Sequence, residues 1–478
     1  MHLQRRFSAA ALIVLIATSA TMGASLASPL EQKEKSQNLE INPRSELELS
    51  RMTPDELLAH QRTELRKKIA SDRVNLGYPI LGDTELTDLL QTEQGKRTSA
   101  ELGVPLTGIE EEQARVRLEL ASTYAALKTP VMTAAGESYA GDWFDKTGDG
   151  RIQIYLTGGS DHRSDVQRIF DAAGVSDRLD LVNVTNSLTE LNAALDRVVA
   201  RLRNDDELGR SIATVAVDSH ANRVVVQPSL GDIGATTSVA QAFNDEPTVF
   251  IDEPVSVPRP LTTAYGGDVL GVATGPWCSL GASARTNIPP VGWIYHWITA
   301  GHCGSNYWFH WDTPSSGPHY PGGSTVSIYW DDWSPGDSQA INIPASETSA
   351  LVRTDVYGPF GLRYLTGLDH SIWDTAGVPF ICHSGRSTKA NTGSWISCGS
   401  VITPSITTVS GRPLVNMRRW SCGYAAPGDS GGTTSGLFYG SYDASLLGFL
   451  SAGGSGDCFS TRAGTQISGL GIGEFVLR

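Results

Sequence analysis

The strongest constraint on the fold is the uneven distribution of cysteine, tryptophan and charge along the chain. All six cysteines and ten of the eleven tryptophans follow residue 260. Charged residues number 65 in the first 260 positions but only 23 in the last 218. A step of this kind usually marks separate folding units, and 478 residues are enough for two or three of them. We therefore expect a charged, cysteine-free front segment followed by a cysteine-bearing, aromatic rear segment.

The N-terminus has the composition of a secretory signal peptide. Arg5 and Arg6 precede an apolar run from about residue 9 to residue 20, and the string SLA at 25–27 is a typical cleavage site. The run is too short to span a bilayer. We therefore predict a signal peptide at 1–27, export by the general or the twin-arginine route, and a secreted, extracellular product.

Charge and cysteine spacing limit the partners. The formal net charge of −14 argues against nucleic acid or an anionic membrane as the main partner. In an exported protein six cysteines fit three disulfides, although the pairing stays open. The alternative is a thiol or zinc site, but C-x-x-C spacing is absent from the sequence. We expect a monomer with no metal, no cofactor, no nucleic acid and no membrane partner.

The front segment is predicted to begin with a charged, helical part at 28–136. Thr53, Pro54 and Glu56 form a helix start, with threonine as the N-cap, proline in the first turn and glutamate completing a capping box. A second helix is predicted over about 109–127. The heavy charge of this part is interpreted as a solvated helical face and is assigned no chemistry.

A small α+β unit is predicted at 137–245. Its elements, from the periodicity of apolar residues and from capping and turn signals, are a strand at 151–156, a helix at 164–173, a helix after the capping box at 187–190, and a hairpin of strands 213–217 and 223–226.

A proline-rich stretch separates the two segments. Residues 246–264 carry four prolines and are predicted to form an extended, accessible linker that contains a processing site. Beyond it, at 265–478, short β-rich runs alternate with glycine, proline and serine turns, and no long amphipathic helix is evident. This profile is typical of an all-β barrel or sandwich.

Three short strings in the rear segment carry groups that can act together in acyl transfer. His302 lies in TAGHC, Ser430 lies in GDSGG, and Asp337 precedes the apolar strand pattern QAINI. A serine hydroxyl needs a base, histidine titrates in the required range, and a buried carboxylate can orient the imidazole. Gly428 allows a tight turn that can aim the N–H groups of residues 428 and 430 at one oxygen. Asp355 is the alternative carboxylate, in which case Asp337 would only cap a turn.

These strings, in the order histidine, aspartate, serine, resemble those of chymotrypsin-fold serine proteases, in particular the secreted bacterial streptogrisin and alpha-lytic branch. The resemblance covers residues 265–478 and implies an all-β, chymotrypsin-like catalytic domain of two six-stranded β-barrels, preceded by an α+β pro-region. It implies His302 as general base and then acid, Asp337 as the orienting carboxylate and Ser430 as the nucleophile. The N–H groups of Gly428 and Ser430 would form the oxyanion hole.

The resemblance also implies disulfides and a substrate site. The implied pairs are Cys278 with Cys303, Cys382 with Cys398, and Cys422 with Cys458. The string SAGGSGDC resembles the family strand that pairs with the substrate backbone, although its register is ambiguous by one residue. The implied substrate-binding residues are Ser451, Ala452, Gly453 and Gly454 on this strand, with Tyr424 and Arg462 as pocket candidates. A solvent-facing arginine is the simpler interpretation of Arg462.

The hairpin at 215–226 resembles the end of pro-regions in the same branch. This implies a front segment that aids folding and inhibits the enzyme until it is removed, with processing expected between 255 and 268. The expected function is a secreted serine endopeptidase, made as a prepro-precursor and acting on peptides or proteins. The alternatives are a catalytically silent protein-binding module on the same fold and an esterase of the α/β-hydrolase kind. The esterase would require the order serine, aspartate, histidine, which is not the order here.

Overall fold

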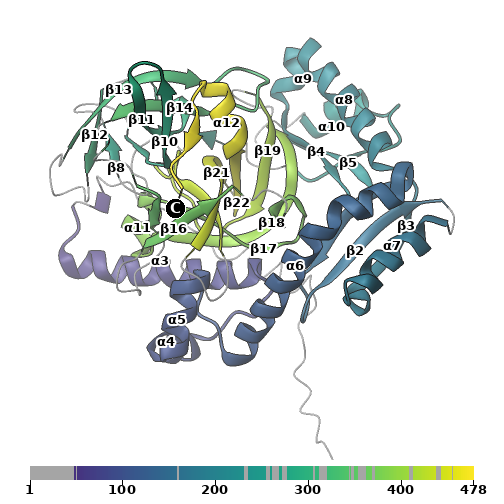
Figure 1. Cartoon of the computed structure of the whole chain (residues 1–478), viewed down its shortest axis with the longest axis horizontal. Helices are drawn as coiled ribbons and strands as arrows, with labels where there is room; N and C mark the ends of the chain where they lie inside the picture. Colours follow the sequence, from purple (N-terminus) through teal and green to yellow (C-terminus); the bar gives the residue numbers. More distant parts are fainter. Residues whose placement is uncertain are drawn as a thin grey trace, which may run out of the picture. The chain divides into compact units, whose positions relative to one another are not determined.

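The computed structural model describes most of the chain from residue 48 onward (Figure 1). The described ranges are 48–49, 51–158, 161–230, 235–254, 259–260, 269–271, 277–304, 307–311, 320–343, 345, 349–353, 362–368, 372–408, 413–437, 443–454 and 456–477. The predicted signal peptide, the alternative carboxylate Asp355 and most of the predicted processing region lie outside these residues. Within the described ranges, every helix is too short or too polar to cross a bilayer.

Four helices lie between residues 54 and 135, in agreement with the helical character predicted for the charged front part. Their bounds are α3 Pro54–Asn75, α4 Asp83–Gln91, α5 Glu93–Leu102 and α6 Gly108–Ala135. The start of α3 follows the predicted capping box: the Thr53 hydroxyl accepts from the Glu56 N–H at 3.3 Å, and the Glu56 carboxylate accepts from the Thr53 N–H at 2.8 Å. The predicted helix at 109–127 is the first part of α6, which continues past Pro130.

The α+β unit contains a small three-stranded sheet and a separate hairpin. The sheet has the order β1 (Tyr139–Asp145), β2 (Arg151–Thr157), β3 (Leu179–Val184). The remaining elements of the unit are α7 Asp161–Ala172, α8 Leu188–Asn204, α9 Asp206–Arg210, β4 Ile212–Asp218, β5 Arg223–Pro228, α10 Ala235–Ala242 and β6 Val249–Ile251. The predicted strand, helices and hairpin are therefore all present, with ends that differ by a few residues.

Two large sheets account for most of the described residues of the rear segment, which confirms its β-rich character. The eight-stranded sheet has the order β23 (Glu474–Phe475), β10 (Ala282–Ile288), β11 (Gly292–Thr299), β14 (Ser338–Ile343), β13 (Tyr320–Tyr329), β12 (Tyr307–Trp311), β8 (Val269–Gly271), β9 (Trp277–Ser279). In β10 the first three residues are buried and the last two are exposed, whereas in β11 the last four residues are buried, so the paired ends of these two strands lie in the core and the other ends reach the surface.

The second sheet is twelve-stranded and includes strands of the front segment. Its main path is β15 (Leu351–Arg353), β16 (Leu362–Gly367), β21 (Asp443–Gly454), β20 (Thr433–Leu437), β17 (Pro379–Ser384), β18 (Ile396–Thr408), β4, β5, β6. Off this path lie β19 (Leu414–Ser421), β22 (Asp457–Arg462) and β7 (Arg259–Pro260). Two short helices, α11 Arg386–Thr392 and α12 Ala463–Leu470, complete the described rear segment.

The front hairpin extends the rear sheet through its strand β4. Ala216, Val215 and Thr214 pair antiparallel with residues 406–408 of β18. This pairing gives the end of β18 a partner that covers backbone groups which would otherwise form an open edge. The sequence predicted the hairpin but not the strand beside which it would lie.

Helix α3 also packs against the rear segment and contributes a buried charge to the contact. The Asp72 carboxylate accepts hydrogen bonds from Lys68 Nζ at 2.7 Å, Ser397 Oγ at 2.9 Å and the Cys398 N–H at 3.3 Å. Burial raises the pKa of Asp72, and the charge and hydrogen bond of Lys68 oppose this shift only in part. The part of the front segment that the sequence analysis interpreted as a solvated face thus has one side inside the protein.

One hydrophobic core contains residues of both segments. The front contributes Leu76, Tyr78, Leu102, Val104 and Leu106, and the rear contributes Phe380, Ile396, Leu437 and Phe449 among others. The described residues of the front and rear segments belong to one compact unit. Burial of these side chains stabilises the contact, because removing apolar surface from water contributes about 25 cal/mol per Å².

Candidate active site

His302 and Asp337 lie at one edge of the eight-stranded sheet because of the pairing of two strands. Strand β11 ends at Thr299, which pairs with Gln339 near the start of the antiparallel strand β14. The short 3₁₀ turn Gly301–Cys303 follows β11 directly and brings the histidine beside the residue that precedes β14. A side chain at position 301 would crowd the backbone N and O of Ser338, each 3.0 Å from an added Cβ, so this approach favours glycine.

Ser430 comes from the other large sheet, in the turn between β19 and β20. The turn is closed by hydrogen bonds from the Asp429 N–H to the Ala426 carbonyl and from the Gly432 N–H to the Asp429 carbonyl, each 3.0 Å. Gly428 has a φ of +104° and Gly431 a φ of +85°, which residues with side chains rarely adopt. The GDSGG string is therefore explained by the backbone path that presents the Ser430 hydroxyl.

The three side chains form a continuous hydrogen-bonded chain. His302 Nε2 lies 2.9 Å from Ser430 Oγ, and His302 Nδ1 lies 2.8 Å from Asp337 Oδ2. The His302 N–H donates to Asp337 Oδ1 at 3.0 Å, which fixes the carboxylate relative to the backbone of the histidine. His302 is 8% exposed, and Asp337 and Ser430 are 1% and 0% exposed. The structure thus brings together the three residues that the sequence motifs selected.

Asp337 is held by two further residues. The Ser451 hydroxyl donates to Asp337 Oδ2, and Gln466 Oε1 accepts from the Asp337 N–H at 3.1 Å. Burial alone would raise the pKa of Asp337, but the charge of His302 and the hydrogen bonds from His302 and Ser451 outweigh it and lower the pKa. Within the string at 451–454, Ser451 is thus a residue whose side chain contacts Asp337.

Gln466 was missed by sequence reasoning. It lies on α12, 129 residues after Asp337. Its amide also donates to the Pro335 carbonyl at 2.8 Å, and its oxygen accepts from the Ser338 hydroxyl at 2.8 Å. A single glutamine in a short helix has no local signal for such a role, because its partners are set by the packing of α12.

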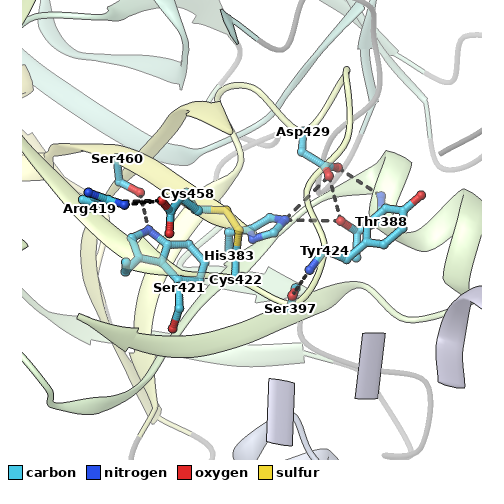
Figure 2. The surroundings of a disulfide bond; sticks show 12 residues. His383, Thr388, Ser397, Arg419, Ser421, Cys422, Tyr424, Asp429, Cys458 and Ser460 are labelled. Carbon is cyan, nitrogen blue, oxygen red and sulfur yellow. Dashed lines mark hydrogen bonds and ion pairs between the residues drawn. A yellow bond between two sulfur atoms is a disulfide. The ribbon is translucent and has the colours of Figure 1, made fainter. Parts of the chain in front are cut away.

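Asp429, the residue before Ser430, is anchored inside the protein (Figure 2). Its carboxylate accepts from the Thr388 N–H at 3.1 Å, the Thr388 hydroxyl at 2.7 Å and the Ala426 N–H at 3.0 Å. His383 Nε2 lies 3.6 Å from the same carboxylate, and the imidazole packs on Trp420 with ring centroids 5.6 Å apart. The turn that carries Ser430 is therefore held by the hydrogen bonds that Thr388 and Ala426 donate to Asp429, and these bonds are formed while the front segment is still attached.

The structure contains the three disulfides that the resemblance implies. Their pairs are Cys278–Cys303, Cys382–Cys398 and Cys422–Cys458. The first joins the turn of His302 to β9, and the third joins the segment before Ser430 to β22, as Figure 2 shows. Two of the bridges thus tie the segments that carry the site to neighbouring strands.

The substrate strand predicted at 451–454 is the last part of β21, and another strand occupies its edge. Ala452 pairs antiparallel with Pro260 and Gly453 with Arg259, the two residues of β7. These two residues belong to the linker in which processing was predicted. The edge expected to receive a substrate backbone is thus covered by the chain itself.

The two pocket candidates lie in different surroundings. Tyr424 is 1% exposed, and burial raises the pKa of its phenol. Its N–H donates to Ser397 Oγ at 2.8 Å, as Figure 2 shows. Arg462 is not solvent-facing: its guanidinium donates to Asp374 Oδ1 at 2.7 Å and to the Pro404 carbonyl at 2.5 Å.

Among the described residues, no three histidine, cysteine, aspartate or glutamate side chains lie where they could together hold a metal ion. Comparison with known protein families and with curated proteins gives no match to this chain. The chemistry of the site must therefore be inferred from its own geometry.

Proposed function

We propose that the protein is a serine endopeptidase of the chymotrypsin fold, in the streptogrisin and alpha-lytic branch, made as a secreted prepro-precursor. The observation that carries this proposal is the chain of hydrogen bonds from Ser430 through His302 to Asp337. In this proposal the eight-stranded sheet and the rear strands of the twelve-stranded sheet correspond to the two barrels of the fold. The site would then lie between them, with two of its three residues on the first.

In the proposed reaction Ser430 Oγ attacks the carbonyl carbon of a peptide bond while His302 Nε2 takes its proton. Asp337 stabilises the imidazolium, which is consistent with its lowered pKa. The N–H groups of Gly428 and Ser430 would stabilise the oxyanion. His302 then protonates the leaving amine, and water hydrolyses the acyl-enzyme by the same steps in reverse order.

The front segment fits a pro-region that aids folding and blocks the site. Three contacts support this role: strand β4 on β18, helix α3 on the Ser397 region, and β7 on the edge of β21. A substrate peptide would take the place of β7 and add a strand to β21. The alternative of a catalytically silent binding module is disfavoured, because such a module has no need for a serine, a histidine and a carboxylate in hydrogen-bond contact.

The nucleophile is tested by Ser430→Ala, with the front segment removed from the variant and from the unchanged protein by the same added protease. We expect turnover of a peptide substrate to fall by roughly 10⁶-fold, because attack through Oγ is lost, and a serine-directed organophosphate to label the unchanged protein but not the variant. The matched control is Ser405→Ala, which removes a hydroxyl from an exposed serine and should change neither readout. Peptidase activity retained in Ser430→Ala would exclude the mechanism.

A further inference from the structure

The four residues from Ala426 to Asp429 form a tight turn with the features of a type II β-turn. The Asp429 N–H donates to the Ala426 carbonyl at 3.0 Å, Pro427 stands at the second position, and Gly428 stands at the third with a φ of +104°. Type I and type II turns differ mainly by a half-turn of the central peptide group, which here joins Pro427 to Gly428. The type of this turn therefore decides the face to which the Gly428 N–H points.

The hydroxyl of Ser387 holds the carbonyl of that central peptide group. Ser387 lies in α11 and is 4% exposed, and its Oγ donates to the Pro427 carbonyl at 2.7 Å, across 40 residues of sequence. In a trans peptide the C=O and the N–H point in opposite directions, so this bond also fixes the direction of the Gly428 N–H. A serine near a helix start often caps its own helix, but the N-cap of α11 is Gly385.

The turn is held at both ends by other residues. Thr388, the residue after Ser387, donates its N–H and its hydroxyl to the Asp429 carboxylate, as Figure 2 shows. Ser279 of β9, in the eight-stranded sheet, donates its hydroxyl to the Gly428 carbonyl at 2.9 Å and its N–H to the Ser430 carbonyl at 2.7 Å. Rotation of the central peptide group is therefore a local change that leaves these anchors in place.

We propose that Ser387 is a positioning residue, whose hydroxyl holds the Pro427–Gly428 peptide group in the orientation that turns the Gly428 N–H toward the reacting oxygen. This inference rests on the proposed function, in which that N–H and the Ser430 N–H stabilise the oxyanion. Without the hydroxyl the type I orientation becomes populated, and in it the Pro427 carbonyl faces the oxyanion in place of the N–H. The fraction of competent molecules then falls, and the rate of acylation falls with it.

The test compares Ser387→Ala and Ser387→Thr with the unchanged protein, after the same added protease has removed the front segment from all three. The substrate is the peptide p-nitroanilide that the unchanged protein cleaves fastest. We expect Ser387→Ala to lower kcat by about 10-fold to 100-fold with little change in KM, because loss of a whole oxyanion donor costs about 10²–10³-fold in kcat. Ser387→Thr keeps the hydroxyl and should recover most of the activity.

The matched control is Ser327→Ala on β13. It removes a partly buried hydroxyl that donates to the Leu470 carbonyl at 3.0 Å, a bond of the same kind that does not involve the turn. We expect kcat and KM of this variant to equal those of the unchanged protein.

Two readouts separate the orientation of the turn from a general disturbance of the fold. A peptide boronic acid of the same sequence forms with Ser430 a tetrahedral adduct whose oxygen occupies the oxyanion position, so its affinity should fall in Ser387→Ala by the same factor as kcat/KM. The pH profile of kcat/KM should keep its shape, because the contacts of His302 with Ser430 and Asp337 are not altered.

A second variant tests the rotation of the peptide group itself. Gly428→Ala disfavours the φ of +104° and should therefore favour the rotated peptide. We expect kcat to fall at least as far as in Ser387→Ala. Adding Ser387→Ala to Gly428→Ala should cost less than about 3-fold more, because two changes that act on one peptide group are not additive.

The outcomes separate this inference from the proposed function. An unchanged kcat in Ser387→Ala, an equal loss in Ser327→Ala or Ser387→Thr, a displaced pH profile, or fully additive losses with Gly428→Ala would overturn the role of Ser387 and leave the endopeptidase standing. If the unchanged protein without its front segment hydrolyses neither casein nor any peptide p-nitroanilide, the proposed function itself is refuted.

Discussion

Asp337 is a buried carboxylate whose surroundings keep it ionised. It accepts from the His302 N–H, contacts His302 Nδ1 and accepts from the Ser451 hydroxyl. A carboxylate with these donors can hold the imidazole in the tautomer that leaves Nε2 free to accept a proton from Ser430. Replacing the carboxylate by an amide of the same shape therefore removes both the charge that stabilises the imidazolium and the acceptor that sets the tautomer of His302.

Asp337→Asn is expected to lower kcat by about 10⁴-fold at neutral pH, because the amide favours the wrong tautomer of His302 and does not stabilise the imidazolium. Steady-state hydrolysis of a peptide substrate measures the effect. Asp355→Asn is the paired control, since Asp355 is the other carboxylate that the sequence allows. The larger loss in the Asp355 variant would reassign the third member of the site.

The lowered pKa of Asp337 predicts a contribution to stability that depends on pH. In the unfolded chain the carboxyl titrates near its ordinary value of 3.8, and in the folded protein it titrates below that value. Its contribution is therefore complete above pH 4 and is lost as the pH falls through the folded-state pKa. The raised pKa values of Asp72 and Asp457 act in the opposite direction.

A difference measurement isolates Asp337 from these other groups. The free energy of unfolding of Ser430→Ala is compared with that of Ser430→Ala/Asp337→Asn between pH 2 and pH 7, by denaturant titration. We expect a constant difference above about pH 4 that narrows at lower pH. A difference that grows on acidification would contradict the direction of the pKa shift.

That His302, Asp337 and Ser430 lie together could be predicted from short local motifs, whereas contacts that depend on the packing of distant segments could not be predicted. His302, Asp337 and Ser430 stand in short motifs, and each motif reflects a backbone requirement such as the turn at Gly428. The contact of Gln466 with Asp337 spans 129 residues, and the ion pair of Arg462 with Asp374 spans 88. No local pattern encodes such approaches.

At the scale of elements, helix starts and hairpins could be predicted because their signals are local. The capping boxes at Thr53 and Ser187 are both formed. The strand that lies beside a given strand could not be predicted. Alternation of apolar residues shows which side chains share a face of the sheet, but it does not determine which strand pairs with which. Hence β4 was predicted as a strand, whereas its place beside β18 was not.

Helix α3 supplies the element-scale prediction, through its buried pair of Lys68 and Asp72. Asp72→Asn leaves Lys68 without its counter-charge, and both side chains are at most 1% exposed. We expect a loss of about 3–5 kcal/mol in the free energy of unfolding, measured in a Ser430→Ala background to prevent self-digestion. The control, Asp83→Asn, breaks a pair with Arg66 in which Asp83 is 82% exposed, and should cost less than about 1 kcal/mol.

At the scale of the whole molecule, covalent cross-links are confined to the rear segment. The bridges Cys382–Cys398 and Cys422–Cys458 have sequence separations of 16 and 36. In the chain-entropy description a longer closed loop gives more stabilisation, because more freedom is removed from the unfolded chain. The front segment has no cysteine and is held by non-covalent contacts alone.

Removing each bridge by paired alanine substitutions is expected to lower the free energy of unfolding by about 3 kcal/mol for the shorter loop and about 4 kcal/mol for the longer one. Denaturant titration of the two double variants, again in a Ser430→Ala background, checks both the sizes and their order. A larger loss for the shorter loop would show that native contacts, rather than loop length, decide the effect.

The pairing of β4 with β18 determines the state of the protein after a cut in the linker. The hydrogen bonds of residues 214–216 with residues 406–408, like the shared core, do not pass through the linker. Cleavage of one peptide bond in the linker would leave a nicked, two-chain complex in which only the pairing of β7 with β21 has changed. Release of the rear chain is then a separate step, which requires the front chain to unfold or to be digested. The time between the cut and this release is the lifetime of the nicked complex.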